Sequence, residues 1–268
     1  MKKAKLWIES LRLSATIPAG ILVHVSFILT HQKTDWLLVL EAFLVATFAM
    51  LHNDYVDRVN DLKKGRRLAF EHPNQFRIVL IVGWVIIWAI ALIPLAAYTF
   101  IIPIIVISMV YSYTRKIPYL PNLLVAFASA SPLIWANGVS IPIISATPNS
   151  FMFLAILSCI LGREIIKDIE DAEVDVGWKR TPVSLGWFSK ENEQRLACHL
   201  IGGGVGWCIL ATLIRISQGS IIAILIYIVG IFLCWYGSIM LYSEDTPERG
   251  KKFFDRGMLL LLLSLIVA

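Results

Sequence analysis

Long apolar runs alternate with short polar segments along the whole chain. A helix needs about 20 apolar residues to cross the hydrocarbon core of a bilayer, so each run of that order is a candidate span. Nine runs can be drawn, at 14–31, 36–53, 78–97, 99–114, 121–140, 150–166, 197–214, 219–242 and 257–268. This pattern predicts an all-α integral membrane protein with a bundle of nine transmembrane helices.

The composition of the 268 residues agrees with that pattern. Hydrophobic residues make up 57% and charged residues 16% of the chain, whereas a soluble domain is about 25% charged. A soluble enzyme and a disordered chain are therefore both excluded. The four cysteines lie in apolar runs without CxxC spacing, which is neither a zinc nor a disulfide pattern.

Basic residues are sorted between the loops. With the N-terminus placed in the cytoplasm, every one of the 24 Lys and Arg except Lys33 and Arg215 falls on the cytoplasmic side. This positive-inside asymmetry predicts a multi-pass protein of the cell membrane whose N-terminus is cytoplasmic. The net charge of +5 is thereby explained by membrane topology, and no nucleic-acid partner is expected.

Acidic residues gather in two short segments on the same predicted side. The first is NDYVDRVND at 53–61, and the second is REIIKDIEDAEVD at 163–175. Within each segment three aspartates are offset by three and four residues, which places them on one face if a helix continues there. These aspartates are Asp54, Asp57 and Asp61 in the first segment, and Asp168, Asp171 and Asp175 in the second.

Stacked carboxylates repel one another and destabilise a helix unless a cation offsets them. Hard oxygen ligands suit Mg²⁺, which prefers few carboxylates together with water and substrate phosphates. The three aspartates of each segment form a stripe of carboxylates, and the two stripes thus predict two or three Mg²⁺ ions around one diphosphate. The alternative for either stripe alone is an acidic, solvated loop.

At these positions the sequence resembles the UbiA superfamily of intramembrane prenyltransferases. NDYVDRVND matches the NDxxDxxxD motif of that superfamily, and REIIKDIEDAEVD resembles its second, DxxxDxxxD motif. YSYTRKIPYLPN, at 111–122, resembles the YxxxK segment between them. The form REIIKDIED is most similar to the branch that includes the digeranylgeranylglyceryl phosphate synthases.

The resemblance implies one UbiA-like domain over residues 1–268, with a central cavity open to lipid. It also implies Mg²⁺-dependent transfer of a prenyl group from a polyprenyl diphosphate to a lipophilic acceptor. That acceptor is a glycerol-phosphate ether lipid or an aromatic quinone precursor. Seven residues would hold the metal: Asn53, Asp54, Asp57, Asp61, Asp168, Asp171 and Asp175. The six aspartates would also be the catalytic residues.

Basic and polar neighbours of the motifs are the candidates for diphosphate binding. This set contains Asn53, Arg66, Arg67, Tyr111, Arg115 and Lys116. Arg115 stands where the superfamily has a lysine, and it keeps the charge while offering a bidentate fork. Lys63, Lys64 and Lys179 are interpreted instead as facing lipid headgroups.

Three other functions remain as alternatives. A cyclase of the same fold would let an alkene of the substrate capture the cation. A secondary transporter would place acidic ion sites near the midplane, often within inverted repeats, whereas both stripes here lie at the membrane boundary. A lipid-scaffold protein would use the basic loops but would leave the acidic stripes unexplained.

Overall fold

Helices form every element in the described part of the chain. The structure is a computed structural model, and it describes residues 2–30, 32–63, 67–92, 101–137, 148–172, 179–216 and 221–242, with 253, 256–257 and 259–261. The elements are α1 (Lys2–Ser10), α2 (Leu13–Leu29), α3 (Trp36–Val56), α4 (Arg58–Lys63), α5 (Leu68–Glu71), α6 (Pro73–Leu92), α7 (Ile101–Val110), η1 (Tyr111–Tyr113), α8 (Leu120–Ala130), η2 (Ser131–Asn137), α9 (Pro148–Glu170), α10 (Lys190–Ile216) and α11 (Ile221–Tyr242).

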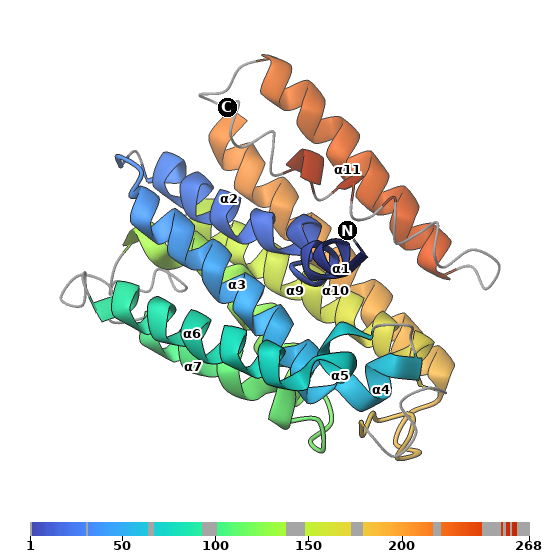
Figure 1. The fold of residues 1–268 in the computed structure, drawn as a ribbon. Helices are drawn as coiled ribbons and strands as arrows, with labels where there is room; N and C mark the ends of the chain where they lie inside the picture. Colours follow the sequence, from blue (N-terminus) through green and yellow to red (C-terminus); the bar gives the residue numbers. More distant parts are fainter. Residues whose placement is uncertain are drawn as a thin grey trace.

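The long helices lie alongside one another as a bundle (Figure 1). α2 packs on α3, α3 packs on α6, and α9 packs on both α8 and α10. The short helices α4 and α5 lie where α3 ends and α6 begins, and α1 contacts both α3 and α5. The ends of several long helices therefore share one polar region with these short helices.

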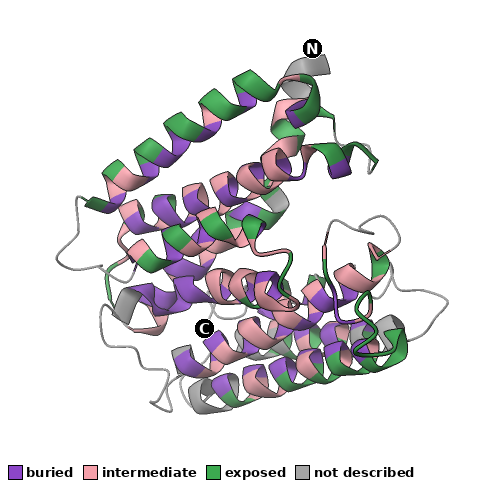
Figure 2. Ribbon diagram, turned by 90° about the horizontal axis from the view of Figure 1, so that it is seen from below, coloured by how far each residue is buried: buried purple, intermediate pink, exposed green. Residues whose placement is uncertain are grey.

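Burial follows the inner faces of the bundle (Figure 2). One large cluster joins side chains from α2, α3, α6, α7, α9 and α10, including Leu38, Ile87 and Ile201. The outer faces are also apolar: on α6, Ile78 is 61% exposed and Val85 is 63% exposed. A soluble protein would not present such a continuous apolar helix face to water, whereas a bilayer would cover it.

Particular residues set the bounds of the helices. The carboxylate of Asp35 caps α3, because it accepts hydrogen bonds from the backbone N–H of Leu37 (2.9 Å) and Leu38 (3.4 Å). Pro132 has no N–H to donate, and the chain tightens from α8 into the 3₁₀ helix η2 at Ser131.

Close packing of α9 against α10 depends on two glycines. A Cβ atom on Gly162 would lie 2.7 Å from the carbonyl oxygen of Ala197. A Cβ atom on Gly204 would lie 2.4 Å from the sulfur of Cys159. The backbones of these helices approach more closely than any larger residue would allow.

Eight of the nine predicted runs coincide with helices in the described part of the chain. The ninth, 257–268, lies largely outside it, so the count of nine and the central cavity stay predictions. By length and composition, α3 and α6 are the described helices that suffice to cross a membrane. Short apolar helices also occur, at Ala15–Leu29, Ile101–Tyr113, Leu120–Trp135 and Ile228–Gly237. The short helices α1, α4 and α5 lie outside the apolar runs and were not predicted.

Candidate active site

The first acidic segment spans a break in the helix. α3 ends at Val56, and α4 begins at Arg58. The backbone N–H of Asp57 still donates to the carbonyl of Asn53, and that of Asp61 donates to the carbonyl of Asp57, both at 2.8 Å. Because this spacing of four residues persists across the break, Asp57 and Asp61 remain one turn apart. Asp54, Asp57 and Asp61 are all buried.

Asp54 forms an ion pair with Arg12, which lies in the link between α1 and α2. The backbone of Arg12 is left-handed, with φ of 47° and ψ of 49°, a conformation uncommon outside glycine. Nη1 of Arg12 also lies 3.7 Å from the sulfur of Met50. Arg12 was not among the predicted site residues, because its one signal in the sequence is a basic residue directly before an apolar run.

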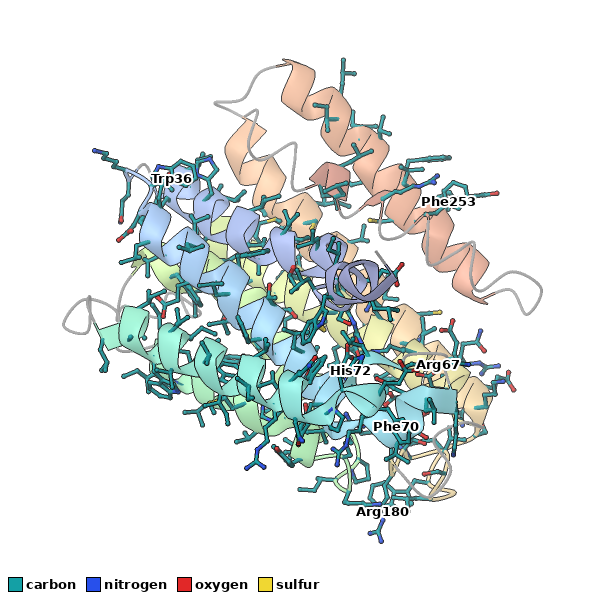
Figure 3. The ribbon with its side chains drawn as sticks, viewed as in Figure 1. Trp36, Arg67, Phe70, His72, Arg180 and Phe253 are labelled. Carbon is teal, nitrogen blue, oxygen red and sulfur yellow. The ribbon has the colours of Figure 1, made fainter. Side chains whose placement is uncertain are left out.

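A cavity of about 200 Å³ adjoins this ion pair. Its polar lining includes Arg12, Asp54, Asp61 and Arg67, and its remaining lining comes from α1, α5 and the start of α6. Arg67 is exposed and precedes α5 (Figure 3). The cavity thus brings three of the predicted site residues together with Arg12.

The N-terminal helix forms one wall of this cavity. Leu6, Glu9 and Ser10 line it from α1. The ring of Trp7 stacks on Phe76 of α6, with 5.3 Å between the ring centroids. Aromatic stacking therefore fixes α1 over the end of the bundle where the first acidic segment lies.

Asp57 forms a two-pronged ion pair with Arg115, in the loop after η1. Nη2 of Arg115 also donates to Oδ1 of Asn53 at 2.9 Å, and Nε donates to the carbonyl of Ser112 at 2.8 Å. Nδ2 of Asn53 donates in turn to Oδ2 of Asp57 at 3.1 Å. The structure therefore joins two predicted metal ligands to a predicted diphosphate ligand.

Two further candidates, Tyr111 and Lys116, come from η1 and the loop after it. The hydroxyl of Tyr111 donates to the backbone carbonyl of Ala49 at 3.3 Å. Lys116 is exposed.

The second acidic segment lies at the end of α9. Oδ1 of Asp168 forms an ion pair with the ammonium of Lys179. Oδ2 of Asp168 accepts a hydrogen bond from Nδ2 of Asn122, on α8, at 2.9 Å. The interpretation of Lys179 as facing lipid headgroups is wrong, because its side chain lies on Asp168. Asp171 follows one backbone turn after Lys167.

Two candidates, Arg66 and Asp175, lie outside the described residues. The loop that follows the second segment nevertheless joins the first half of the site. The backbone N–H of Arg180 donates to the carbonyl of Arg115 at 3.0 Å. This bond brings the loops after η1 and α9 together at one end of the bundle.

The donor set fits a magnesium diphosphate better than a metal held by protein alone. In the described residues no three His, Cys, Asp or Glu side chains converge as a metal cage. Mg²⁺ characteristically takes one or two carboxylates and completes its shell with phosphate oxygens and water. Buried Asp54 and Asp57 and half-buried Asp168 would supply the carboxylates, and Arg12, Arg115 and Lys179 lie beside them, where they could contact the phosphates.

Comparison with solved structures shows the same fold in two proteins. A structure described as a UbiA homolog from Aeropyrum pernix K1 superposes with a TM-score of 0.74 at 14% identity, covering 94% of this chain and 97% of that one. A structure reported for the biosynthesis of digeranylgeranylglyceryl phosphate synthase in membranes superposes with a TM-score of 0.66 at 21% identity. The match covers 100% of this chain and 98% of that one. No curated protein gives a match.

The model of the UbiA prenyltransferase family matches residues 17–265, which is nearly the whole chain. That range holds both acidic segments and their basic partners except Arg12. Members of this family are membrane proteins, in agreement with the apolar outer faces of the bundle. The chain is therefore a transferase enzyme that belongs to the UbiA prenyltransferase family.

Proposed function

We propose that the enzyme transfers a prenyl group from a polyprenyl diphosphate to a lipophilic acceptor, with Mg²⁺ as its cofactor. One observation carries this proposal. Two acidic segments lie at the same end of an apolar bundle, and in each of them a basic side chain forms an ion pair with a carboxylate that is buried or half-buried. A diphosphate with a long hydrocarbon tail needs both the polar end and the apolar body.

In this mechanism the bond between C1 of the prenyl group and the diphosphate oxygen breaks, and its electron pair leaves with the diphosphate. Magnesium, when bound, would supply Lewis-acid stabilisation of that leaving charge. Arg12, Arg115 and Lys179 hold positive charge where the phosphates would lie, so they stabilise the same charge electrostatically. The acceptor then forms a bond to C1 and loses a proton.

The same basic side chains also stabilise the carboxylates themselves. Burying a carboxylate costs free energy unless a cation or hydrogen-bond donors accompany it. Arg12 stabilises Asp54, and Arg115 stabilises Asp57. When a magnesium diphosphate binds, each guanidinium would move from its carboxylate to a phosphate oxygen and leave the carboxylate to the metal.

For the acceptor we propose a glycerol-phosphate ether lipid. The sequence form of the second motif supports this choice, as does the structural likeness to a chain reported with digeranylgeranylglyceryl phosphate synthase. An aromatic acceptor and a cyclase reaction are the alternative outcomes of the test below. We propose a cytoplasmic N-terminus and active site from the distribution of Lys and Arg.

The test uses purified full-length protein, radiolabelled geranylgeranyl diphosphate, Mg²⁺ and a panel of acceptors. We expect diphosphate release that EDTA, Asp54→Ala and Asp168→Ala each abolish. Asp35→Ala is the matched control, because Asp35 caps the opposite end of the helix that carries Asp54. Substrate movement across vesicles without cleavage of diphosphate would overturn the proposal in favour of a transporter.

A further inference from the structure

Asn122 lies outside both acidic segments yet contacts two groups of the second half of the site. Its Nδ2 donates to Oδ2 of Asp168 at 2.9 Å. Its Oδ1 accepts from Nζ of Lys179 at 3.1 Å. The side chain is 2% exposed, so water does not compete for these bonds. One neutral amide thus bridges a carboxylate and the cation paired with it.

Chemistry fixes the orientation of this amide. An ammonium group donates only, so the Asn122 atom facing Lys179 must be the carbonyl oxygen. The NH₂ group then faces Asp168, which accepts in its ionised form. Rotating the amide by half a turn would set a donor against Lys179 and an oxygen against a carboxylate, and both contacts would become repulsive.

The start of α8 is held in place, which fixes Asn122 in turn. Tyr119 precedes α8 with a left-handed backbone, at φ of 61°, and its hydroxyl donates to Oε1 of Glu193 on α10 at 3.0 Å. Glu193 is buried. Burial and this neighbouring carboxylate raise the pKa of Tyr119, so its hydroxyl remains a donor. Asn122 is therefore presented by a helix end that is anchored to a second helix.

We infer that Asn122 is a positioning residue, which orients Asp168 and Lys179 to receive a magnesium diphosphate. Its donation to Oδ2 fixes the plane of the Asp168 carboxylate, so that Oδ1 stays directed at Lys179 and the pair would be oriented for an incoming magnesium diphosphate. Its carbonyl restrains the ammonium of Lys179 beside the position that the phosphates would take. This inference rests on the proposed function and adds to it a residue that neither acidic motif contains.

The primary test measures binding without turnover. Mn²⁺ replaces Mg²⁺, inorganic diphosphate replaces the substrate, and equilibrium dialysis against the same solution without protein reports the Mn²⁺ bound to full-length protein in detergent. Partners that orient metal ligands are worth about 10–100-fold in metal affinity. We expect Asn122→Ala to weaken Mn²⁺ binding by about 10-fold, and Asn122→Ser, which keeps one short polar group, to weaken it less.

Ser131→Ala is the matched control. Ser131 is fully buried, follows the other end of α8, and donates to the carbonyl of Ala128 at 2.8 Å. The Ser131→Ala variant therefore also loses a side-chain hydrogen bond, but at the end of α8 away from Asn122 and Asp168. We expect unchanged Mn²⁺ binding, and melting temperatures of all variants show whether each one folds.

A double-mutant cycle separates positioning from general support of the fold. If Asn122 acts through Asp168, Asn122→Ala adds little to the loss of Mn²⁺ binding already caused by Asp168→Asn. Equal losses in both backgrounds would overturn the inference, as would wild-type affinity in a folded Asn122→Ala protein. If the wild-type protein binds no Mn²⁺ with diphosphate, the proposed function itself fails, and the two failures are thereby distinguishable.

Discussion

The ion pair between Arg115 and Asp57 provides a quantitative test of the site. Arg115→Ala removes the guanidinium and leaves Asp57 buried without its cation. The side chains of Arg115 and Asp57 are 14% and 11% exposed, so water would solvate the stranded carboxylate poorly. Breaking a buried pair from one side typically costs 3–5 kcal/mol, and we expect about 3 kcal/mol because this pair keeps some exposure.

That cost corresponds to a lower melting temperature. A loss of 1 kcal/mol lowers the melting temperature of a chain of roughly this size by about 2–4 °C, so Arg115→Ala should melt about 6–12 °C lower. Arg115→Lys keeps the charge but not the fork that spans Asp57, Asn53 and Ser112, so its loss should be smaller. Thermal melting in detergent without Mg²⁺ measures both variants.

Arg195 offers a matched control on the surface. Its Nη2 lies 2.5 Å from Glu191, but these side chains are 53% and 70% exposed. Exposed pairs contribute about 0–1 kcal/mol, so Arg195→Ala should melt within about 2 °C of the wild type. Adding Asp57→Asn to Arg115→Ala should recover stability, because the stranded charge disappears. Equal small shifts for Arg115→Ala and Arg195→Ala would refute the reasoning.

Other variants test separate features. Arg12→Ala should lower the rate of prenyl transfer about 10-fold, because a charged hydrogen bond to phosphate is lost. Lys190 is exposed, so Lys190→Ala should leave the rate unchanged. Equal rates for the two variants would contradict a role of Arg12 in binding phosphate. Glu41 is fully buried, and neither of its carboxyl oxygens has a hydrogen-bond partner among the described residues. Glu41→Leu should therefore raise stability by about 1–2 kcal/mol in thermal melting, and a lower melting temperature would contradict that. Gly83→Ala places a Cβ 1.8 Å from the Phe48 ring and should cost about 1–3 kcal/mol by overpacking; an unchanged melting temperature would show that the ring moves freely.

The bundle itself was largely predictable, because lipid-facing helices need apolar residues on every side and such runs are visible without any partner. The 36–53 run, for instance, became a helix beginning at Trp36. The short helices were not predictable in the same way. α4 and α5 have 6 and 4 residues, and helices of that length depend on tertiary contacts for their stability.

The candidate site was predictable only as far as its acidic spacing. Asp54 and Asp57 are visible in the sequence as a pair, and so is the basic character of Arg115. The contacts of Asp54 with Arg12 and of Asp168 with Asn122 join residues 42 and 46 positions apart. No local pattern reports a contact of that range, because it arises from how the helices pack. The break at Asp57 was equally hidden, since no glycine or proline marks it.

The pairing of the carboxylates has a consequence for selectivity. Asp54 with Arg12, Asp57 with Arg115, and Asp168 with Lys179 carry three negative and three positive charges, so these six side chains sum to zero. A lone divalent cation would have to displace the bases, and a lone phosphate would have to displace the acids, without compensation in either case. Metal and diphosphate arriving together satisfy both sets of groups. If a magnesium diphosphate is the ligand, we therefore expect metal and diphosphate to bind cooperatively, and either one alone to bind weakly.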